Sequence, residues 1–287
     1  MKVDIRTYFH DDTSTFTHLL IDTATSYAAV IDPVLGFDQK SGHTDTEFLD
    51  EILGDIQRLQ LTLLYIMETH AHADHLTGAM YLREKTSAEI VIGSAITEVQ
   101  SIFKRVFNEG EALATDGSQF DRLLRSGDTL VLGESEIGII ATPGHTPACV
   151  SYTVNDSDVF VGDTLFPPDV GTARCDFPGG DAGTLFDSTR TLLALRDDVV
   201  LHLCHDYPPE PRDIISCVTV KQQRAENIHV HDGISRESFI EMRNQRDSGL
   251  EMPRLILPSL QVNIRAGAFP EAEANGVSYL KIPLNAL

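Results

Sequence analysis

Short apolar runs separated by polar turns dominate the first part of the chain and indicate a sheet. Residues 16–22 and 27–32 alternate apolar and polar side chains, which predicts two strands joined by a turn at residues 24–26. Residues 62–67 form an almost continuous apolar run, which predicts a buried strand. The opening of the chain is therefore expected to build one sheet.

Apolar residues at helical spacing lie between these runs. They recur between residues 48 and 59, after a Thr44–Glu47 segment with capping-box spacing, so we expect a helix ending near residue 61. Further helices are predicted at residues 76–85, 94–104, 181–195 and 235–246, and further strands at 88–93, 129–132, 136–142, 149–154, 159–161 and 199–204. This order is compatible with two packed sheets covered by helices on both outer faces.

The whole chain, residues 1–287, is predicted to form a single domain with a C-terminal extension from about residue 208. Its tail from residue 253 is rich in Pro and Asn and is expected to be an ordered extension. Residues 108–127 are polar and irregular, so we expect a loop there, or a lid near a functional site.

Composition and charge exclude several classes of function. Lys and Arg number 22 against 43 Asp and Glu, a net charge of −21 that repels both nucleic acid and anionic lipid. No apolar run approaches the about 20 residues of a membrane span, and no signal-peptide core is present, so a cytoplasmic location is expected. The four cysteines include no C-x-x-C pair, which suggests reduced thiols. Cys149 and Cys204 are expected in the core, and Cys175, in a Gly-rich polar loop, is the one to test for reactivity.

The densest cluster of candidate chemistry follows the strand predicted at residues 62–67. Within six residues the chain places His70, His72, Asp74 and His75. Imidazole and carboxylate together suit zinc, iron or manganese, and no cysteine lies nearby to indicate a structural zinc site. We therefore predict a metal site at this turn.

Three more candidate ligands occur at the ends of later strands. His145 lies in P-G-H-T-P, Asp163 in G-D-T-L-F, and His205 in C-H-D-Y. A sheet brings strand ends together at one edge, so residues far apart in sequence can share a metal there.

These motifs, T-H-A-H-A-D-H, P-G-H-T-P, G-D-T-L-F and C-H-D-Y, resemble in order and spacing those of the metallo-β-lactamase superfamily. They span residues 69–207. The resemblance implies an α+β fold, an αββα sandwich with a metal site at one edge.

Two branches of that superfamily fit the motifs. Resemblance to glyoxalase II-like thioester hydrolases implies two metal ions, such as Zn(II), held by all seven residues. Resemblance to persulfide dioxygenases of the ethylmalonic-encephalopathy type implies one Fe(II) per chain, held by His70, His145 and Asp163. That smaller set leaves metal positions open for a persulfide and O2. The three-residue iron set is contained in the seven-residue set, so spacing alone does not separate the two branches. In the iron enzyme, the other four residues would surround the metal without binding it.

The loop at residues 171–180, G-T-A-R-C-D-F-P-G-G, favours the dioxygenase. It resembles the G-x-x-R-x-D-F loop of bacterial persulfide dioxygenases, in which Arg174 would contact the substrate or brace the iron site and Asp176 would orient it. The alternative, that Arg174 only pairs with Asp176 to stiffen the loop, stays open. Tyr207 similarly resembles a tyrosine near the iron, or is an ordinary strand-end residue.

The resemblance thus predicts an enzyme that oxidises glutathione persulfide with O2 and water to glutathione and sulfite, with a thioester hydrolase as the alternative. We expect no nucleic-acid or membrane partner, and a homodimer stays open. Candidate basic residues for gripping glutathione are Lys221, Arg224, Arg265 and Lys281. The H-V-H-D sequence at residues 229–232 is expected to be structural rather than a second metal site.

Overall fold

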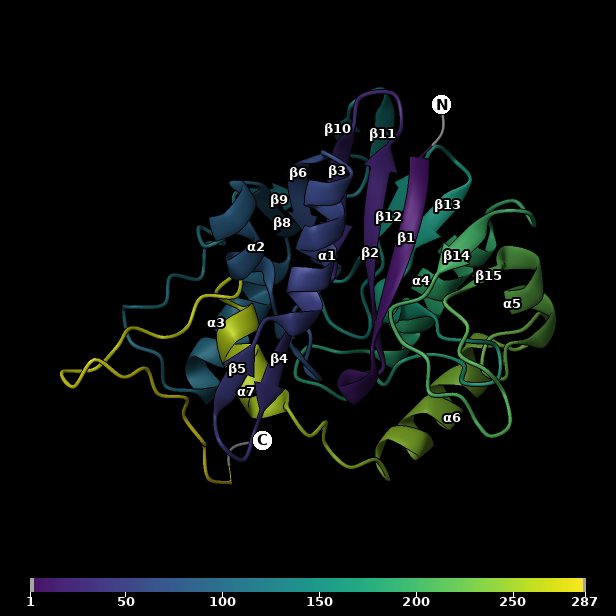
Figure 1. Ribbon diagram of the computed structural model, residues 1–287. Coiled ribbons are helices and arrows are strands. Elements are labelled where there is room, and N and C mark those ends of the chain that lie inside the picture. Colours follow the sequence, from purple (N-terminus) through teal and green to yellow (C-terminus); the bar gives the residue numbers. More distant parts are fainter. Residues whose placement is uncertain (1–2, 286–287) are drawn as a thin grey trace.

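A computed structural model describes residues 3–285 and contains two six-stranded sheets (Figure 1). The first has the order β1-β2-β3-β6-β8-β9. Its strands are β1 (Val3–His10), β2 (Thr15–Asp22), β3 (Tyr27–Ile31), β6 (Thr62–Met67), β8 (Glu89–Gly93) and β9 (Arg122–Leu124). The strands β3, β6, β8 and β9 run parallel to one another.

The second sheet follows the chain order from β10 to β15. Its strands are β10 (Thr129–Leu132), β11 (Ser135–Ala141), β12 (Val150–Val154), β13 (Asp158–Phe160), β14 (Val200–His202) and β15 (Cys217–Thr219). All neighbours are antiparallel except β13 and β14, which run parallel. A small third sheet joins β5 (His43–Asp45), β4 (Val34–Asp38) and β7 (Leu76–Thr77).

Helices cover both outer faces of the paired sheets, as Figure 1 shows. They are α1 (Glu47–Arg58), α2 (Ala79–Thr86), α3 (Ile96–Val106), α4 (Ala182–Leu193), α5 (Val220–Glu226), α6 (Arg236–Asp247) and α7 (Ile256–Asn263), with short 3-10 turns η1 (Asp11–Thr13) and η2 (Gly162–Thr164). No helix within residues 3–285 is long and apolar enough to cross a membrane.

Three apolar clusters hold these layers together. One lies between the first sheet and α1, α2 and α3, with Ile66 and Ile90 facing Leu49. A second fills the space between the two sheets, where Met67 and Tyr152 are both fully buried. The third joins the second sheet to α4, α5 and α6. This is the predicted αββα sandwich, stabilised mainly by apolar surface removed from water.

The predicted hairpin and most predicted strands are confirmed within a residue or two. Two local predictions are wrong. The helix expected at 76–85 begins at Ala79, because Leu76 and Thr77 pair with β4 instead. The capping box expected at Thr44–Glu47 does not form, because residues 43–45 are a strand; a capping box occurs at Thr219 instead.

The C-terminal tail contains a helix, α7, that the sequence does not indicate clearly. Pro258 lies in its first turn, where a missing N–H costs nothing because that group would have no partner in the helix. The helix is buried along most of its length and packs against β7. A segment rich in proline thus becomes part of the body of the protein.

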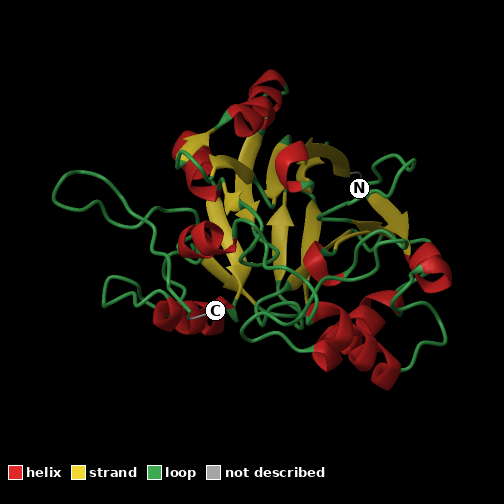
Figure 2. Cartoon of the chain, turned by 90° about the horizontal axis from the view of Figure 1, so that it is seen from below, coloured by secondary structure: helices red, strands yellow, loops and turns green. Residues whose placement is uncertain are grey.

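Parallel pairing explains where the candidate ligands gather. The carboxyl ends of β3 and β6 meet at one edge of the first sheet, and those of β13 and β14 meet at one edge of the second. An isolated bridge between Thr15 and His205 joins the two edges. Figure 2 looks from below at this end of the sandwich, where loops cross between the helices.

Candidate metal centre

His70, His145 and Asp163 come from three loops and lie together at this edge. One potential ligand atom from each lies within 4.8 Å of the other two. The Nε2 atoms of His70 and His145 are 3.7 Å and 3.5 Å from Oδ2 of Asp163. All three side chains are buried, so their attraction for a cation is weakly screened by water.

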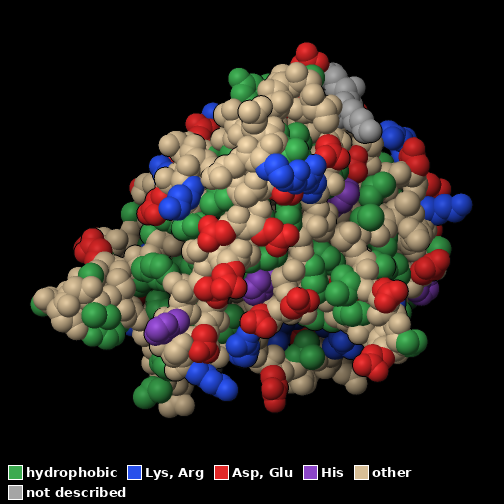
Figure 3. Space-filling view, in the orientation of Figure 1, with side chains coloured by type: hydrophobic (Ala, Val, Ile, Leu, Met, Phe, Trp, Pro, Cys, Tyr) green, Lys and Arg blue, Asp and Glu red, His purple; other side chains and the backbone are tan. Residues whose placement is uncertain are grey.

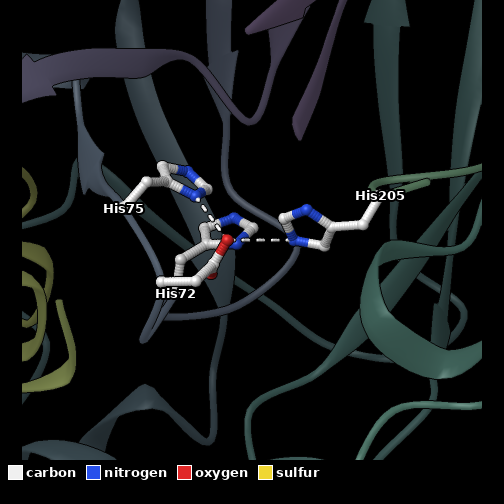
Figure 4. Close-up of side chains that lie close together, drawn as sticks. His72, His75 and His205 are labelled. Atoms are coloured by element: carbon white, nitrogen blue, oxygen red, sulfur yellow. Dashed lines mark hydrogen bonds and ion pairs between the residues drawn. The ribbon is translucent and has the colours of Figure 1, made fainter. Parts of the chain in front are cut away.

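His72, Asp74, His75 and His205 form an adjacent cluster with the same 4.8 Å spacing. Figure 4 shows the rings of His72, His75 and His205 turned toward one another around a carboxylate oxygen, that of Asp74. Its Oδ2 lies 3.4 Å from His75 Nδ1 and 3.3 Å from His205 Nε2. The two clusters touch, because His205 Nε2 is also 3.3 Å from Oδ1 of Asp163.

Hydrogen bonds fix which ring nitrogen of each imidazole faces the centre. His145 Nδ1 donates to the carbonyl oxygen of Arg174 at 2.6 Å, and His205 Nδ1 donates to the carbonyl of Ser14 at 3.1 Å. His70 Nδ1 lies 3.0 Å from Thr69 Oγ1, whose own proton goes to Asp32, so the imidazole is the donor. The Nε2 lone pairs are therefore left for a ligand.

More than half of the buried side-chain polar atoms that lack a hydrogen-bond partner within residues 3–285 belong to these clusters. Among residues 3–285 they include Nε2 of His70, His75 and His205 and Oδ1 of Asp163. Buried polar atoms are rarely left unpaired, and cations bound at the two clusters would satisfy these. The donor set, imidazole nitrogen and carboxylate oxygen, suits iron or zinc. The residues present therefore fit a metal ion.

The electrostatics of the clusters favour the same conclusion. Burial lowers the pKa of His70 and His72 well below the ordinary value, which keeps these imidazoles neutral. Burial alone would raise the pKa of Asp74, but the neighbouring His205 and His75 hold it well below its usual range. His70, His72 and Asp74 are thus in the protonation states that metal ligands require, whereas Asp74 and Asp163 raise the pKa of His205 against the effect of its burial.

Two residues that the sequence did not single out organise the histidine turn. Asp32, directly after β3, accepts bonds from the Thr69 backbone N–H at 2.7 Å and hydroxyl at 2.9 Å, and lies 3.1 Å from His72 Nε2. It adopts a left-handed backbone (φ 51°), a strained conformation for a residue with a side chain. The sequence signal that could have indicated this role is the position of Asp32 at the end of a strand and directly before a proline.

Asn263 is the second such residue. From the last position of α7 it donates to the carbonyl oxygens of His72 and His75, both at 2.8 Å, and accepts from the N–H of Thr77 at 2.8 Å. A residue near the end of the chain thereby fixes the backbone of a turn near residue 72. Nothing in its local sequence indicated this role.

The Arg174 loop contacts the centre through its backbone. The guanidinium of Arg174 points away from this contact: it donates to both carboxylate oxygens of Asp176, at 2.7 and 2.8 Å, and to the carbonyl of Glu251 at 2.6 Å. The carbonyl oxygen of Arg174 itself holds His145 in place. The pairing with Asp176, one of the two alternatives considered, is therefore present in the structure.

A cavity of about 220 Å³ opens beside the first cluster. Its lining includes His145, Asp163, Asp74, Arg174 and Tyr207 together with the apolar Phe166, Val170, Phe177, Leu250 and Pro253. Tyr207 stacks on His205 with a ring-centroid distance of 5.8 Å and an interplanar angle of 16°. The candidate ligands are thus accessible from one side through a mostly apolar pocket.

Other expectations can be compared with the structure. Cys175, the thiol suggested for a reactivity test, is buried, and burial together with the neighbouring Asp247 raises its pKa to about 12, which disfavours the reactive thiolate. Residues 108–127 are mostly loop, as expected, apart from the strand β9, and none of them lines the cavity. Cys149 and Cys204 are buried as predicted.

The basic residues proposed for glutathione lie elsewhere. Arg265 and Lys281 pair with Glu109, and Arg224 pairs with Asp232. Lys221 is exposed on α5, and none of the four lines the cavity.

Comparison with known proteins agrees with this fold. Residues 17–205 match the family model described as the metallo-beta-lactamase superfamily. The chain therefore belongs to the metallo-β-lactamase superfamily.

Its relatives carry names from both branches. A "probable metallo-hydrolase" of Burkholderia pseudomallei is 49% identical over 98% of each chain, and glyoxylase B2 of Dictyostelium discoideum is 46% identical over 100% of this chain and 98% of its own. Persulfide dioxygenase ETHE1 of Mus musculus is 31% identical over 92% of this chain and 88% of its own. The crystal structure of ETHE1 from Myxococcus xanthus matches with a TM-score of 0.73 at 32% identity, covering 92% of this chain and all of that one.

Proposed function

We propose that the protein is an Fe(II)-dependent persulfide dioxygenase that converts glutathione persulfide, O2 and water to glutathione and sulfite. The observation that carries the proposal is the set of His70, His145 and Asp163 beside an accessible cavity. Two imidazoles and one carboxylate on one side of a site are typical of non-haem Fe(II) oxygenases. The likeness to ETHE1 in sequence and structure supports it.

In this proposal His70, His145 and Asp163 hold one Fe(II), which would supply the redox chemistry with O2. The chain contributes geometry and environment. The Arg174 carbonyl and Thr69 hydroxyl orient the two imidazoles, and the apolar walls, including Phe177, limit the water around the reacting sulfur. Tyr207 lines the same cavity, where its hydroxyl could donate to a substrate atom.

A dinuclear thioester hydrolase is the second candidate. It is favoured by the complete adjacent cluster of His72, Asp74, His75 and His205, and by the names of the relatives at 49% and 46% identity. In that enzyme all seven residues would hold two Zn(II), which would activate a water molecule for attack on the thioester.

Metal content and substrate turnover separate the two candidates. Protein purified without oxygen is expected to hold about one iron per chain and to consume O2 when glutathione persulfide is added. Two zinc ions per chain, no O2 uptake and turnover of S-lactoylglutathione would establish the hydrolase instead. We also propose a cytoplasmic location, which four free cysteines are compatible with.

A further inference from the structure

A second cavity, of about 400 Å³, lies between the C-terminal tail and the segment that precedes β9. Residues 109–119 and 265–281 supply most of its walls, and none of its lining residues belongs to the cavity beside the metal clusters. Small-molecule sites in proteins commonly enclose about 300–1,000 Å³. The proposed function makes no use of this cavity, although it is larger than the first.

Part of its lining is apolar and open to water. Phe269 and Tyr279, both in the tail, are 46% and 50% exposed, and Met80 and Leu113 line the same cavity. Figure 1 shows the tail running outside the body at the left, and Figure 3 shows hydrophobic side chains on the surface of this projection. An apolar group that covers the two rings removes their surface from water, so the cavity favours a ligand with an apolar body.

Two basic side chains share one carboxylate in this cavity. Glu109 Oε2 lies 2.9 Å from Arg265 Nη2, and Glu109 Oε1 lies 3.4 Å from Lys281 Nζ. The side chains of Arg265 and Glu109 are only 10% and 9% exposed. Even with their bonds to the carbonyls of Gln261 and Asn108, both basic groups have N–H donors left over among the described residues. One positive charge is thus unmatched, and this end of the cavity suits an anionic group.

Two further carboxylates, those of Glu271 and Glu273, line the same cavity from the exposed tail. Neither side chain has an ion pair or a hydrogen bond within residues 3–285. A simple anion would meet their repulsion and that of the net charge of −21, and a simple cation would leave the basic end without a partner. A ligand with one charge of each sign satisfies both ends.

We propose that this cavity binds a short peptide with free ends and apolar side chains. Its carboxylate binds Arg265 and Lys281. Its ammonium group binds Glu271 or Glu273, and its side chains cover the two aromatic rings. Because Arg265 is buried and the two carboxylates are exposed, the charges of the ligand stand apart. Two residues of extended chain span about 7 Å, so a dipeptide separates its charges where a single amino acid does not.

The helix α7 connects this cavity to the histidine turn. Asn263, at the end of the helix, donates to the carbonyls of His72 and His75, and Arg265 follows two residues later. A peptide that binds Arg265 therefore also fixes the segment that holds this turn. Its binding adds to the stability of the folded protein, as for any ligand of the folded state.

Calorimetry with leucyl-phenylalanine on the metal-loaded protein tests the proposal. The C-terminal amide and the N-acetyl form of this dipeptide, which each lack one charge, should bind about tenfold more weakly. Lys281→Ala should weaken binding of the free dipeptide by a similar factor but leave that of the amide unchanged, because the lost contact is the one to the carboxylate. The Lys281 side chain is half exposed, so its removal leaves the fold intact. Lys221→Ala is the matched control, since Lys221 is exposed on α5 and does not line the cavity.

The acidic end is tested in the same way. Replacing both carboxylates, Glu271→Gln with Glu273→Gln, should weaken binding of the free dipeptide about tenfold and leave that of the N-acetyl form unchanged. No binding to the wild type, equal affinity for the dipeptide and its amide, or an equal loss in Lys221→Ala would each overturn the proposal.

Two further measurements exclude other occupants. Tyr207→Ala, a change in the cavity beside the metal clusters, should bind the dipeptide as the wild type does, and a loss would place the dipeptide in that cavity instead. A protein that sediments as a dimer and binds no dipeptide would assign the second cavity to another copy of the chain. None of these outcomes depends on which reaction the metal centre performs, so the proposed function and this proposal stand or fall separately.

Discussion

At the scale of single residues, the candidate centre depends on hydrogen bonds that commit one nitrogen of each imidazole. His70, His145 and His205 each direct Nδ1 to an oxygen of the protein and Nε2 to the interior of the site. The orienting acceptors are two backbone carbonyls and one threonine hydroxyl. Backbone acceptors cannot be read from side-chain motifs, so the sequence predicted the ligands but not what orients them.

Substitution of the candidate ligands distinguishes one metal from two. His70→Ala, His145→Ala and Asp163→Ala are each expected to lose bound iron, because two ligands do not hold Fe(II) firmly. His72→Ala and His205→Ala are expected to retain much of it. Iron per chain, measured after anaerobic purification, checks this, and equal loss in all five variants would indicate the dinuclear site.

Arg174→Ala is expected to retain iron but to lose turnover by about a hundredfold, the scale of a small misplacement in an active site. The backbone carbonyl that orients His145 remains, whereas the bonds to Asp176 and Glu251 are lost. Iron content and O2 uptake measured on the same sample check this. Unchanged turnover would show that the side chain only stiffens the loop.

At the scale of elements, the hydrophobic pattern predicted those strands and helices whose own sequence carries the signal. The hairpin of β2 and β3 and the strand β6 were predictable because these short runs are rich in apolar side chains, which matches their nearly continuous burial. The helix α7 was not, since its short sequence carries a proline and becomes a helix through burial against β7. Asn263, which α7 brings to the histidine turn, was therefore missed as well.

The contacts of Asn263 predict a large effect from a substitution far from the ligands in sequence. Asn263→Leu leaves the N–H of Thr77 and two carbonyls of the histidine turn without their partner inside the protein. Each such group costs about 1–3 kcal/mol, so the free energy of unfolding should fall by at least that much. Urea unfolding measures it, with the exposed Asn244→Ala as the control. Equal stability of the two variants would contradict the role of α7.

The loop around the site also depends on one glycine. Gly171 has φ +99°, which L side chains rarely adopt, and a Cβ there would meet the ring of His229. That ring accepts a bond from the N–H of Thr172 at 3.0 Å and so helps to hold the loop. His229, the first histidine of the H-V-H-D sequence, thus has the structural role predicted for it. It lies in a turn rather than on a strand.

Gly171→Ala is expected to destabilise the fold by about 1–2 kcal/mol from backbone strain alone, with the contact to His229 adding to it. Thermal unfolding measures the change. Gly110→Ala serves as the control, because a Cβ at Gly110 meets nothing within 4 Å. A Gly171→Ala variant as stable as the control would show that the loop adapts freely.

At the scale of the whole molecule, the site exists because two sheets pack face to face, with the strand ends that carry the ligands at the same end of the sandwich. His18 on β2 bridges them, since its Nε2 donates to the carbonyl of Leu203 at 3.0 Å while Nδ1 lies 3.0 Å from the Thr7 hydroxyl. The ring is buried against Phe160 of the second sheet. A neutral imidazole satisfies both bonds, whereas a protonated one would lose the acceptor at Nδ1.

This arrangement predicts how stability responds to acid. Burial, with a contribution from His202, lowers the pKa of His18 from 6.5 to about 3. Below pH 6.5 the unfolded chain takes up a proton at this position that the folded protein does not, so stability falls as the pH drops toward 3. His18→Gln should lower stability at pH 7 but make its decline between pH 6.5 and 3 shallower, by up to about 1.4 kcal/mol per pH unit. Urea unfolding of both metal-free proteins across that range measures the slopes. Equal slopes would mean that His18 titrates alike in the folded and unfolded states.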